Sequence, residues 1–450
     1  MLVPSDTIAA LATPVGTSAL ALIRASGPMA RLLVPALFAQ APLPRIAQHA
    51  DYRDPQGILI DDVLFTFFAG PNSFTGEDCL EISCHGNPFI AQKILADLLA
   101  RGCRSADPGE FSKRAFLSGR LDLSQAEAVM DLIHARSDQA LAAANQQLRG
   151  SLGRYMAELT TRLIKTLAHI EAYIDFPDED LPEENRQSIN NDIDTLISDT
   201  ARLLATSHYG ALLREGIKTV ILGEPNAGKS SLLNCLVGHE RALVSPEPGT
   251  TRDYLEELII IGPYWLRLID TAGLNLTPAP LEQRGIDKSL EQATQADLFL
   301  WVIDATHPRP DLPSDFSRLL TTQNTLVVYN KCDLPVVAQS PLPQPFQSVN
   351  FSTITADGLT ELQAALVNLG ASFQVNVGSE VIAINARHTQ ALEQAQNCLQ
   401  SAKLKLAQNI ASELLSSDLR SALESFAQIS GKIDHERILD ELFASFCIGK

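Results

Sequence analysis

The order of apolar and polar positions divides the chain into segments of different predicted structure. Apolar runs at residues 18–27 and 62–70 predict strands, and their ends are marked by Gly, Pro and Asn. Residues 89–102 carry apolar side chains at helical spacing and end at a glycine. Residues 1–118 therefore predict a mixed α/β unit.

Long Ala- and Leu-rich amphipathic stretches follow, at 123–150 and 152–174. Either Asp122 or Ser124 is a candidate cap for the first helix. An acidic, proline-containing stretch at 175–185 predicts a surface loop, and a further helical segment continues to about residue 209.

Short apolar runs then alternate with loops and helices as far as about residue 369, and this alternation is typical of a doubly wound sheet with buried parallel strands. The predicted strands are KTVILG, WLRLID, DLFLWVID and TLVVYN. Helical sequence returns after about residue 379, so we expect the α/β block to be inserted into one helical domain whose halves pack together. The expected domains are 1–118, 119–210 and 379–450 as the two parts of the helical domain, and 215–372 as the inserted block.

Composition places the 450-residue chain among ordinary globular proteins, with 45% apolar and 20% charged residues. The formal net charge is −18 and the isoelectric point is about 4.9. Such an acidic surface excludes nucleic-acid binding through a broad positive field, so an RNA partner requires a local basic patch or a second protein.

The seven cysteines are scattered and odd in number, which favours a reduced cytoplasmic protein over a disulfide framework. Cys79, Cys84 and His85 lack a fourth ligand at useful spacing, so packing is preferred to a metal site. The N-terminus lacks the features of a secretory signal, and no apolar run approaches the ~18–20 residues that span a bilayer. We therefore expect a soluble protein with no membrane partner.

Residues 223–230 (GEPNAGKS) match the phosphate-loop pattern G-x-x-x-x-G-K-[ST] directly after a predicted strand and before a helix. In this context the backbone N–H groups face the phosphates, Lys229 reaches the β- and γ-phosphates, and the Ser230 hydroxyl ligates magnesium.

Further short motifs follow in order: residues 249–253 (GTTRD), 270–273 (DTAG) and 330–333 (NKCD). Asp270 is expected to hold magnesium through water, and the Gly273 N–H to contact the γ-phosphate. The Asp333 carboxylate can accept two hydrogen bonds from guanine, which adenine cannot supply. The set resembles the GTPase superfamily, and Ser352 and Thr353 stand where that superfamily places its second base-contacting loop.

Leu274 occupies the position where signalling GTPases carry a water-orienting Gln, so another group must align the attacking water. Glu282 is a candidate, with an exposed acid on a solvated helix as the alternative. No arginine finger is evident, and a monovalent cation held by Asn226 and residues 245–250 is a candidate replacement for its charge.

The whole chain resembles the MnmE (TrmE) family of tRNA-modification GTPases. The resemblance rests on DTIAALATPVG, ALIRASGP, FTGEDCLEISCHG, DPGEFSKRAFLSGRLDLSQAEAV, the DFPDED loop, the GTPase motifs and the terminal FCIGK. It implies that residues 1–118 form a folate-binding-like α/β domain that binds a one-carbon tetrahydrofolate, of the 5-formyl or methylene type, and dimerises the protein. It also implies that the inserted Ras-like domain is activated by dimerisation around potassium.

The same resemblance implies a reaction and a partner. With the flavoprotein MnmG, in a heterotetramer, the family uses the folate to add an aminomethyl-type (carboxymethylaminomethyl) group at C5 of the wobble uridine of tRNA. Contact with tRNA is then made largely through the partner.

By motif, the resemblance places a catalytic acid at Glu282, magnesium ligands at Ser230 and Thr251, and potassium ligands at Asn226, Ser245, Glu247 and Thr250. The expected folate contacts are Arg24, Glu81, Arg120 and Lys450. Cys447 is a thiol near the folate, a small buried residue of the last helical turn, or part of an exposed tail. The expected GTP-binding residues are Asn226, Ala227, Gly228, Lys229, Ser230, Ser231, Ser245, Pro246, Glu247, Pro248, Gly249, Thr250, Thr251, Asp270, Thr271, Ala272, Gly273, Asn330, Lys331, Cys332, Asp333, Ser352 and Thr353.

Alternatives remain open at this stage. For Arg24 and Glu81 the alternative is an ordinary pair of strand-end charges. For the whole protein the alternatives are a regulatory GTPase of ribosome assembly, which would carry a basic RNA-binding appendage, and a stand-alone folate-dependent one-carbon enzyme with a GTP sensor domain.

Overall fold

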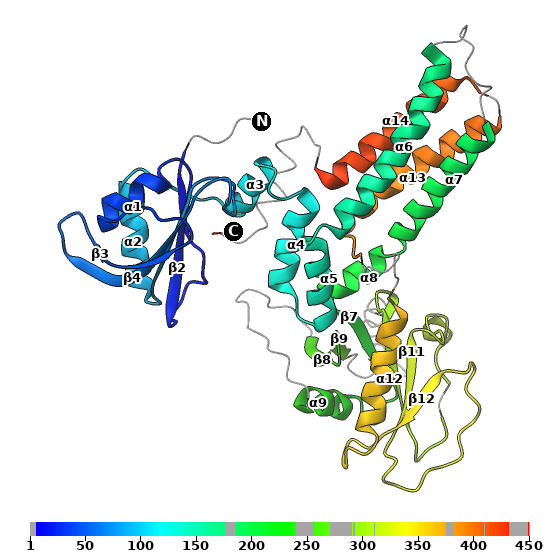
Figure 1. Cartoon of the computed structure of the whole chain (residues 1–450). Coiled ribbons are helices and arrows are strands. Elements are labelled where there is room, and N and C mark those ends of the chain that lie inside the picture. Colours follow the sequence, from blue (N-terminus) through cyan, green and yellow to red (C-terminus); the bar gives the residue numbers. More distant parts are fainter. Residues whose placement is uncertain are drawn as a thin grey trace, which may run out of the picture. The chain divides into compact units, whose positions relative to one another are not determined.

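The computed structural model describes residues 6–175, 186–239, 256–270, 290, 293–309, 311–374, 382–408, 410–431 and 449 (Figure 1). The chain forms two compact units. The first contains Met1–Met130, Leu148–Ala172 and Leu419–Lys450, and the second contains Asp131–Gln147 and Tyr173–Asp418.

The first unit is built on a six-stranded sheet in the order β3-β4-β5-β2-β1-β6, in which only the β1–β6 pair is parallel. The strands are β1 Ile8–Leu11, β2 Leu20–Ser26, β3 Ala47–Arg53, β4 Leu59–Phe68, β5 Cys79–His85 and β6 Arg104–Ser105. The helices are α1 Ala30–Phe38, α2 Pro88–Ala100, α3 Glu110–Leu117, α4 Leu123–His134, α6 Ser151–Asp175 and the C-terminal part of α14 Ser412–Ser430.

One face of this sheet is covered by α1 and α2, whereas the other is covered at its β1 edge, where Ile8 and Ala10 cluster with Phe111 of α3. Strand residues alternate, and the inward set, such as Ile23, Phe65 and Ile82, packs with residues of α1 and α2 in one apolar cluster. The opposite set includes Arg24 and Glu81, which are only partly buried. Polar and charged side chains are therefore free to form a site on the second face.

A local hydrogen bond caps α4, and an ion pair between distant residues joins α6 to α14. Of the two candidate caps, Asp122 is the one used: its Oδ1 accepts from the Gln125 N–H at 2.8 Å and from the Ser124 hydroxyl at 2.6 Å. Arg420 of α14 donates to Glu171 of α6 at 2.8 Å, so the first unit joins helices from both ends of the sequence.

The second unit contains a sheet in the order β12-β11-β10-β7-β9-β8. Its strands are β7 Ile217–Leu222, β8 Glu256–Ile261, β9 Tyr264–Asp270, β10 Leu298–Asp304, β11 Thr325–Asn330 and β12 Gln347–Asn350. Its helices are α5 Asp138–Leu148, α7 Arg186–Leu204, α8 Ser207–Glu215, α9 Lys229–His239, α11 Ser314–Ser317, α12 Leu359–Ser372 and α13 Ala386–Ala407.

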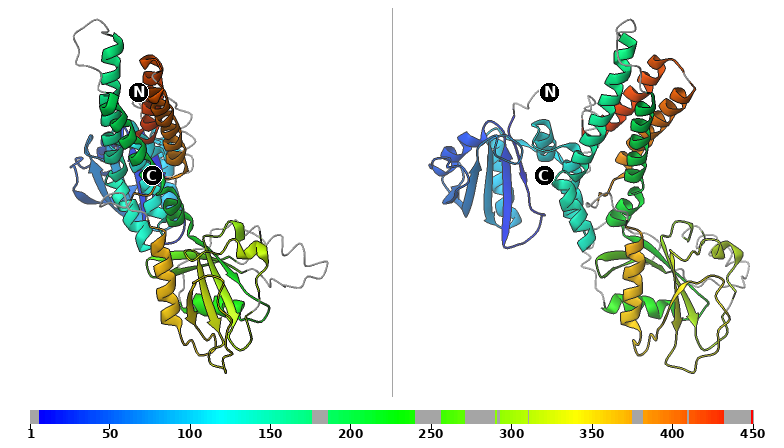
Figure 2. Two further views of the ribbon diagram at one scale, coloured as in Figure 1. Left: turned by 90° about the vertical axis from the view of Figure 1, so that its right-hand side faces the viewer. Right: turned by 45° about the vertical axis from the view of Figure 1, so that its right-hand side comes forward.

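Both faces of this sheet are buried, as the apolar runs predict. Alternate residues of β10 enter different clusters: Leu300 packs with α9 and α12, and Trp301 packs with Phe316 of α11. Figures 1 and 2 show α9 and α12 on the same side of the sheet. The fold class, α/β with a helical part, is confirmed.

Two strands of this sheet were not predicted, β8 and β12. β8 pairs antiparallel with β9, so the sheet is parallel except at that edge. The two strands meet at a tight turn in which Gly262 has φ +56°, a conformation that favours glycine.

Helical segments from before and after the sheet pack together in the second unit, where α7 contacts α13 and Lys403 pairs with Asp194 at 2.5 Å. This pairing agrees with insertion of the α/β block into helical sequence. The four domain boundaries themselves stay a prediction.

Candidate functional sites

The phosphate-loop residues lie between β7 and α9, and their backbone conformation requires glycine at two points. A Cβ on Gly223 would lie 2.4 Å from the carbonyl oxygen of Val302, and one on Gly228 would lie 2.1 Å from Asn330 Nδ2. Gly228 also has φ +98°, and Asn226 between them has φ +66°. The loop therefore packs closely against β10 and β11. It leads directly into the first turn of α9, where backbone N–H groups attract anions.

Lys229 closes this loop. Its side chain is buried, and Nζ donates to the carbonyl oxygens of Gly223 at 2.9 Å and Glu224 at 2.7 Å. Ser230 and Ser231 follow, exposed on α9. The Lys229 ammonium group is thus held against the backbone of the loop, next to the N-terminus of α9. Its positive charge and the helix N–H groups together suit the binding of a polyphosphate.

Asn330, at the end of β11, joins the phosphate loop to a second loop. The fully buried side chain donates through Nδ2 to the Ala227 carbonyl oxygen at 2.8 Å, and its Oδ1 accepts from the Thr353 N–H at 3.2 Å. Residues that are 103 positions apart in sequence are thereby fixed side by side.

Asp333 is oriented by the same second loop. The buried Ser352 hydroxyl donates to Asp333 Oδ1 at 2.6 Å and accepts from the N–H groups of Ile354 at 3.3 Å and Thr355 at 3.2 Å. Among the described residues, nothing donates to Asp333 Oδ2, so this oxygen is open to a ligand. The structure thus brings the predicted residues Asn330, Asp333, Ser352 and Thr353 together.

Cys332, in contrast, bonds to nearby backbone carbonyl groups. Its Sγ donates to the Tyr329 carbonyl oxygen at 3.0 Å, and its N–H donates to the Phe351 carbonyl oxygen at 3.2 Å. Asp304, which the sequence analysis did not select, lies at this site and pairs with Lys331. The only local signal for it was an acid at the C-terminal end of a buried strand.

Many predicted residues lie outside the described part of the chain. They are Ser245, Pro246, Glu247, Pro248, Gly249, Thr250, Thr251, Thr271, Ala272, Gly273, Glu282, Cys447 and Lys450. Asp270 ends β9, but only its backbone is described. Their assigned roles stay predictions, and of the four expected potassium ligands only Asn226 is described.

A second polar site lies on the sheet face of the first unit that is opposite α1 and α2. Arg24 and Glu81 face each other across β2 and β5, and Arg24 donates to Glu81 Oε1 through Nε at 2.9 Å and Nη2 at 2.7 Å. The guanidinium lies over the rings of Phe74 and Phe111, at 5.5 and 5.7 Å from their centroids. Its Nη1 donates to the Gly449 carbonyl oxygen at 3.3 Å, which brings the end of the chain to this pair.

The position of Gly449 excludes a larger residue. It has φ +91°, and a Cβ there would lie 2.5 Å from the Leu11 carbonyl oxygen. The predicted contact residue Lys450 is its direct neighbour in sequence, although its own placement is not described.

Arg120 lines a pocket of about 550 Å³ in the same unit. The other lining residues are Arg45, Ala47, Thr66, Phe68, Asn72, Ser73 and Phe74. A Cβ on Gly76 would lie 2.7 Å from Ser118 Oγ and 3.3 Å from Arg120 Cγ, so this glycine leaves room for the arginine. Two arginines and two aromatic rings suit a ligand with a conjugated ring system and an anionic tail, and the folate group fits this chemistry.

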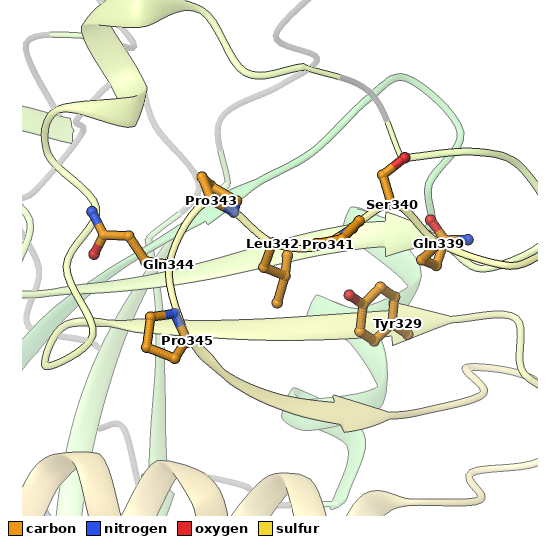
Figure 3. Close-up of a pocket in the computed structure, with 8 residues that line it drawn as sticks. All are labelled: Tyr329, Gln339, Ser340, Pro341, Leu342, Pro343, Gln344 and Pro345. Carbon is orange, nitrogen blue, oxygen red and sulfur yellow. The ribbon is translucent and has the colours of Figure 1, made fainter.

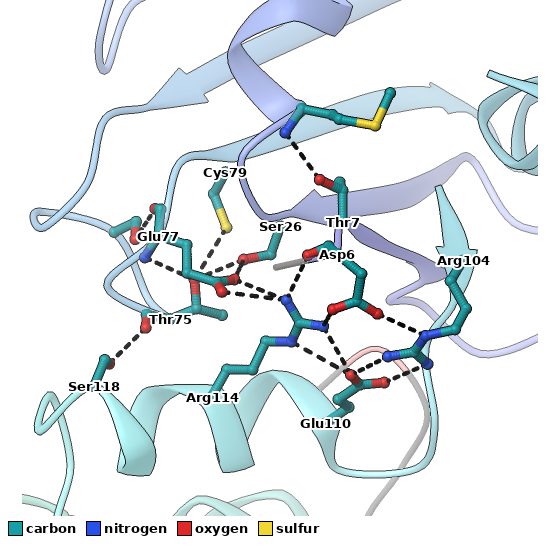
Figure 4. Close-up of polar contacts among 12 residues, drawn as sticks. Asp6, Thr7, Ser26, Thr75, Glu77, Cys79, Arg104, Glu110, Arg114 and Ser118 are labelled. Atoms are coloured by element: carbon teal, nitrogen blue, oxygen red, sulfur yellow. Dashed lines mark hydrogen bonds and ion pairs between the residues drawn. The ribbon is translucent and has the colours of Figure 1, made fainter. Parts of the chain in front are cut away.

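A buried charged network supports the loop that carries Phe74, and the sequence analysis missed it (Figure 4). The Arg114 side chain is 2% exposed and pairs with Asp6 at 2.7 Å, Glu77 at 3.2 Å and Glu110 at 2.9 Å. Burial by itself raises the pKa of Glu110, but hydrogen bonds from Arg104, the Asp107 N–H and Arg114 outweigh it and lower this pKa. The Glu110 carboxylate therefore stays charged and keeps its ion pairs with Arg104 and Arg114.

A second pocket, which lies in the second unit, has a volume of about 520 Å³ (Figure 3). It is lined by Tyr329, Gln339, Ser340, Pro341, Leu342, Pro343, Gln344 and Pro345. No charged side chain lines it, so it does not suit a phosphate or carboxylate ligand.

The described residues contain no cluster of His, Cys, Asp and Glu that fits a metal ion. Within the same residues, no helix combines the length and apolar character needed to cross a bilayer.

Comparison with protein families gives two matches that together span most of the chain. The family described as "MnmE helical domain" matches residues 123–447, and the family described as "GTP-binding protein TrmE N-terminus" matches residues 7–120.

Similar proteins extend over the full length. A protein of Opitutus terrae named "tRNA modification GTPase MnmE" is 57% identical over 447 residues, covering 99% of each chain. A protein of Akkermansia muciniphila with the same name is 43% identical over 452 residues, again covering 99% of each chain. Among solved structures, the G domain of the T. maritima FeoB iron transporter is 24% identical and covers 34% of this chain and 98% of that chain, with a TM-score of 0.24, too low to support an argument.

Proposed function

This chain belongs to the MnmE (TrmE) family of tRNA modification GTPases, and from that premise we propose that it hydrolyses GTP to GDP to drive a modification of the tRNA wobble uridine. It is a GTP-binding GTPase of tRNA modification. Membership in this family sets aside the alternative of a GTPase of ribosome assembly.

One observation carries the nucleotide part of the proposal: Asn330 joins the phosphate loop to the loop that orients Asp333. Its hydrogen bonds to Ala227 and Thr353 fix the distance between the phosphate and base ends of the site. A nucleotide that reaches both ends is then bound by Lys229 at one end and by the Asp333 carboxylate at the other. Guanine offers two N–H donors to a carboxylate, whereas adenine does not, so the site favours GTP.

Magnesium and potassium ions are part of the proposal. When bound, they neutralise phosphate charge. Ser230 and Thr251 would hold magnesium, and Asn226, Ser245, Glu247 and Thr250 would hold potassium. Ser230 supports this assignment because it follows Lys229 at the start of α9, and a hydroxyl oxygen suits a hard cation. Glu282 would position the attacking water.

The cation assignment predicts a dependence of GTP turnover on potassium. We expect turnover per protein to be faster in potassium than in sodium at equal ionic strength, and to rise with protein concentration if two such domains must meet. Phosphate release measured over a series of protein concentrations in each salt checks this. Equal rates in both salts at every concentration would contradict the role of potassium.

We also propose a folate site in the first unit, which supplies a one-carbon unit when loaded. Arg24, Glu81, Arg120 and Lys450 would contact it. Two neighbouring features support this proposal, the pocket lined by Arg120 and the Arg24–Glu81 pair. Phe74 connects them, because it lines the pocket and its ring lies against the Arg24 guanidinium. The carboxylate of Glu81 can accept N–H groups of a pterin, and a cation such as Arg120 can bind the glutamate tail.

Substitution of Arg120 tests this site more cleanly than substitution of Arg24, whose loss leaves Glu81 without its partner. We expect Arg120→Ala to weaken binding of 5-formyltetrahydrofolate about 10- to 100-fold, because a charge-assisted hydrogen bond contributes about 1.5–3 kcal/mol. Calorimetric titration measures the effect. Arg53→Ala, on the exposed surface of β3, is the matched control, and equal affinity of both variants would contradict the assignment.

The proposed assembly is a homodimer that joins the flavoprotein MnmG in a heterotetramer in the cytoplasm, with tRNA bound largely through the partner. The sheet face opposite α1 and α2 supports dimerisation, because Leu20 and Leu64 are 63% and 52% exposed on it. The net charge of −18 supports a tRNA contact shared with a second protein.

A further inference from the structure

The ends of β10 and β11 lie next to each other at the nucleotide site. The two strands are parallel, and Asp304, the last residue of β10, is paired in register with Asn330, the last residue of β11. The next residue, Lys331, has φ +64°, a conformation that is uncommon for a residue with a side chain. The chain therefore turns sharply at Lys331, between Asn330 and the carboxylate of Asp333.

The side chain of Lys331 is held in place by Asp304. Lys331 Nζ donates to Asp304 Oδ2 at 2.6 Å, and the side chains of Lys331 and Asp304 are 30% and 15% exposed. The other oxygen, Oδ1, accepts from the Thr306 hydroxyl at 2.6 Å and the Thr306 N–H at 2.9 Å. Both oxygens of the carboxylate are thus engaged, which fixes its orientation.

The Asp304 carboxylate stays charged at neutral pH. Burial raises the pKa of Asp304, but hydrogen bonds from Lys331 and Thr306 outweigh it and lower this pKa to about 2. His307, whose Nδ1 lies 3.5 Å from Asp304 Oδ2, is the other titratable group that faces the carboxylate among the described residues.

We propose that Asp304 is a positioning residue for the guanine nucleotide: it holds Lys331 so that the hydrocarbon stem of the lysine forms one wall of the base site. This inference rests on the proposed function. Two predicted nucleotide contacts flank Lys331, and each is fixed by its own hydrogen bond. Asn330 is bonded to the phosphate loop, and Asp333 is bonded to Ser352. The Lys331 carbonyl oxygen accepts from the Leu334 N–H at 3.0 Å, but among the described residues the Lys331 side chain has no hydrogen-bond partner in its own loop. The side chain is anchored instead from the neighbouring strand, by Asp304.

A side chain that is already ordered before the ligand binds loses less conformational entropy on binding, so the entropic cost of binding is smaller. Without Asp304, Lys331 would still be present but mobile, so bound nucleotide should leave faster. Recognition of guanine over other bases should not change, because that depends on Asp333.

The test uses the full-length protein and a fluorescent GDP analogue. We expect Asp304→Asn to accelerate release of the analogue about tenfold and to raise KM for GTP while kcat changes little. Lys331→Met should have a similar effect, and the double variant should release the analogue no faster than Lys331→Met alone. Asp304→Glu, which keeps the charge, should restore part of the slow release.

Asp315→Asn, which removes an acid from α11 in the same unit, is the control and should leave release unchanged. If the effects of Asp304→Asn and Lys331→Met on the release rate multiply, Asp304 acts independently of the lysine and the inference is wrong. Unchanged release in Asp304→Asn, with guanine binding still lost in Asp333→Asn, also overturns it but leaves the proposed function intact. If the wild-type protein itself does not bind GDP, the proposed function fails.

Discussion

Replacement of Lys229 by alanine should lower the affinity for GTP and GDP at least about 100-fold and abolish GTP turnover at micromolar substrate. The ammonium group is buried and lies over the carbonyl oxygens of Gly223 and Glu224. No other Lys or Arg lies within the phosphate-loop residues 223–230. Charge-assisted hydrogen bonds contribute about 1.5–3 kcal/mol each, and two of them to phosphate oxygens account for such a loss.

Loss of binding must be separated from loss of folding, because removal of Lys229 takes one hydrogen-bond donor away from each of the carbonyl oxygens of Gly223 and Glu224. Lys229→Met, which keeps the hydrocarbon volume, should lose the same affinity as the alanine variant. Lys218→Ala, on β7 in the same unit, removes a lysine that pairs only loosely with Glu215 at 3.9 Å and should bind normally. Calorimetric titration with GDP, together with the melting temperature without nucleotide, measures both effects. Normal GDP affinity in Lys229→Met would refute the assignment of this loop.

Replacement of Asp333 by asparagine should change base preference from guanine to xanthine, with loss of GDP affinity of about 100-fold or more. The two N–H donors of guanine pair with a carboxylate, whereas the 2-oxo group of xanthine requires a donor in the protein. The structure indicates how asparagine would orient. Because the Ser352 hydroxyl accepts from two backbone N–H groups, its own hydrogen points to residue 333. The amide oxygen of asparagine would take that hydrogen, and its NH₂ group would face the base.

Competition between fluorescent GDP and unlabelled XDP measures this change of preference. The wild-type protein should prefer GDP, and Asp333→Asn should prefer XDP while retaining its melting temperature. Asp315→Asn again serves as the control, since it removes a carboxylate from the same unit without touching the site. Retention of the guanine preference in Asp333→Asn would show that another group reads the base.

Local sequence was sufficient to predict several features. Apolar runs without polar interruption predicted strands buried on both faces, and the clusters around Leu300 and Trp301 confirm this for β10. The glycines of residues 223–230 predicted a loop whose backbone can wrap around phosphates. The close approaches at Gly223 and Gly228 show that a Cβ would not fit at either position. Such features depend on a few consecutive residues, so their physical cause is contained in the local sequence.

Some local interpretations needed the structure to decide between alternatives. Asp122 and Ser124 were both candidate caps for α4, and the hydrogen bond from the Gln125 N–H identifies Asp122. Strand β12 was missed because it lies at one edge of the sheet, is mostly exposed and lacks a long apolar run. Strand β8 lies at the other edge, and its apolar residues 258–261 were a signal that the prediction did not use.

The sequence by itself determined the phosphate-loop pattern, the buried strands and the residues that we predict to read guanine, since these follow from neighbouring residues. Only the tertiary structure decided which distant groups meet: Asn330 with Ala227, Asp304 with Lys331, and Arg24 with Glu81 and Gly449. These contacts depend on strand order and register, which place β10 between β7 and β11 and β2 beside β5. Strand order is set by packing of the whole sheet, and no short stretch of sequence contains that information.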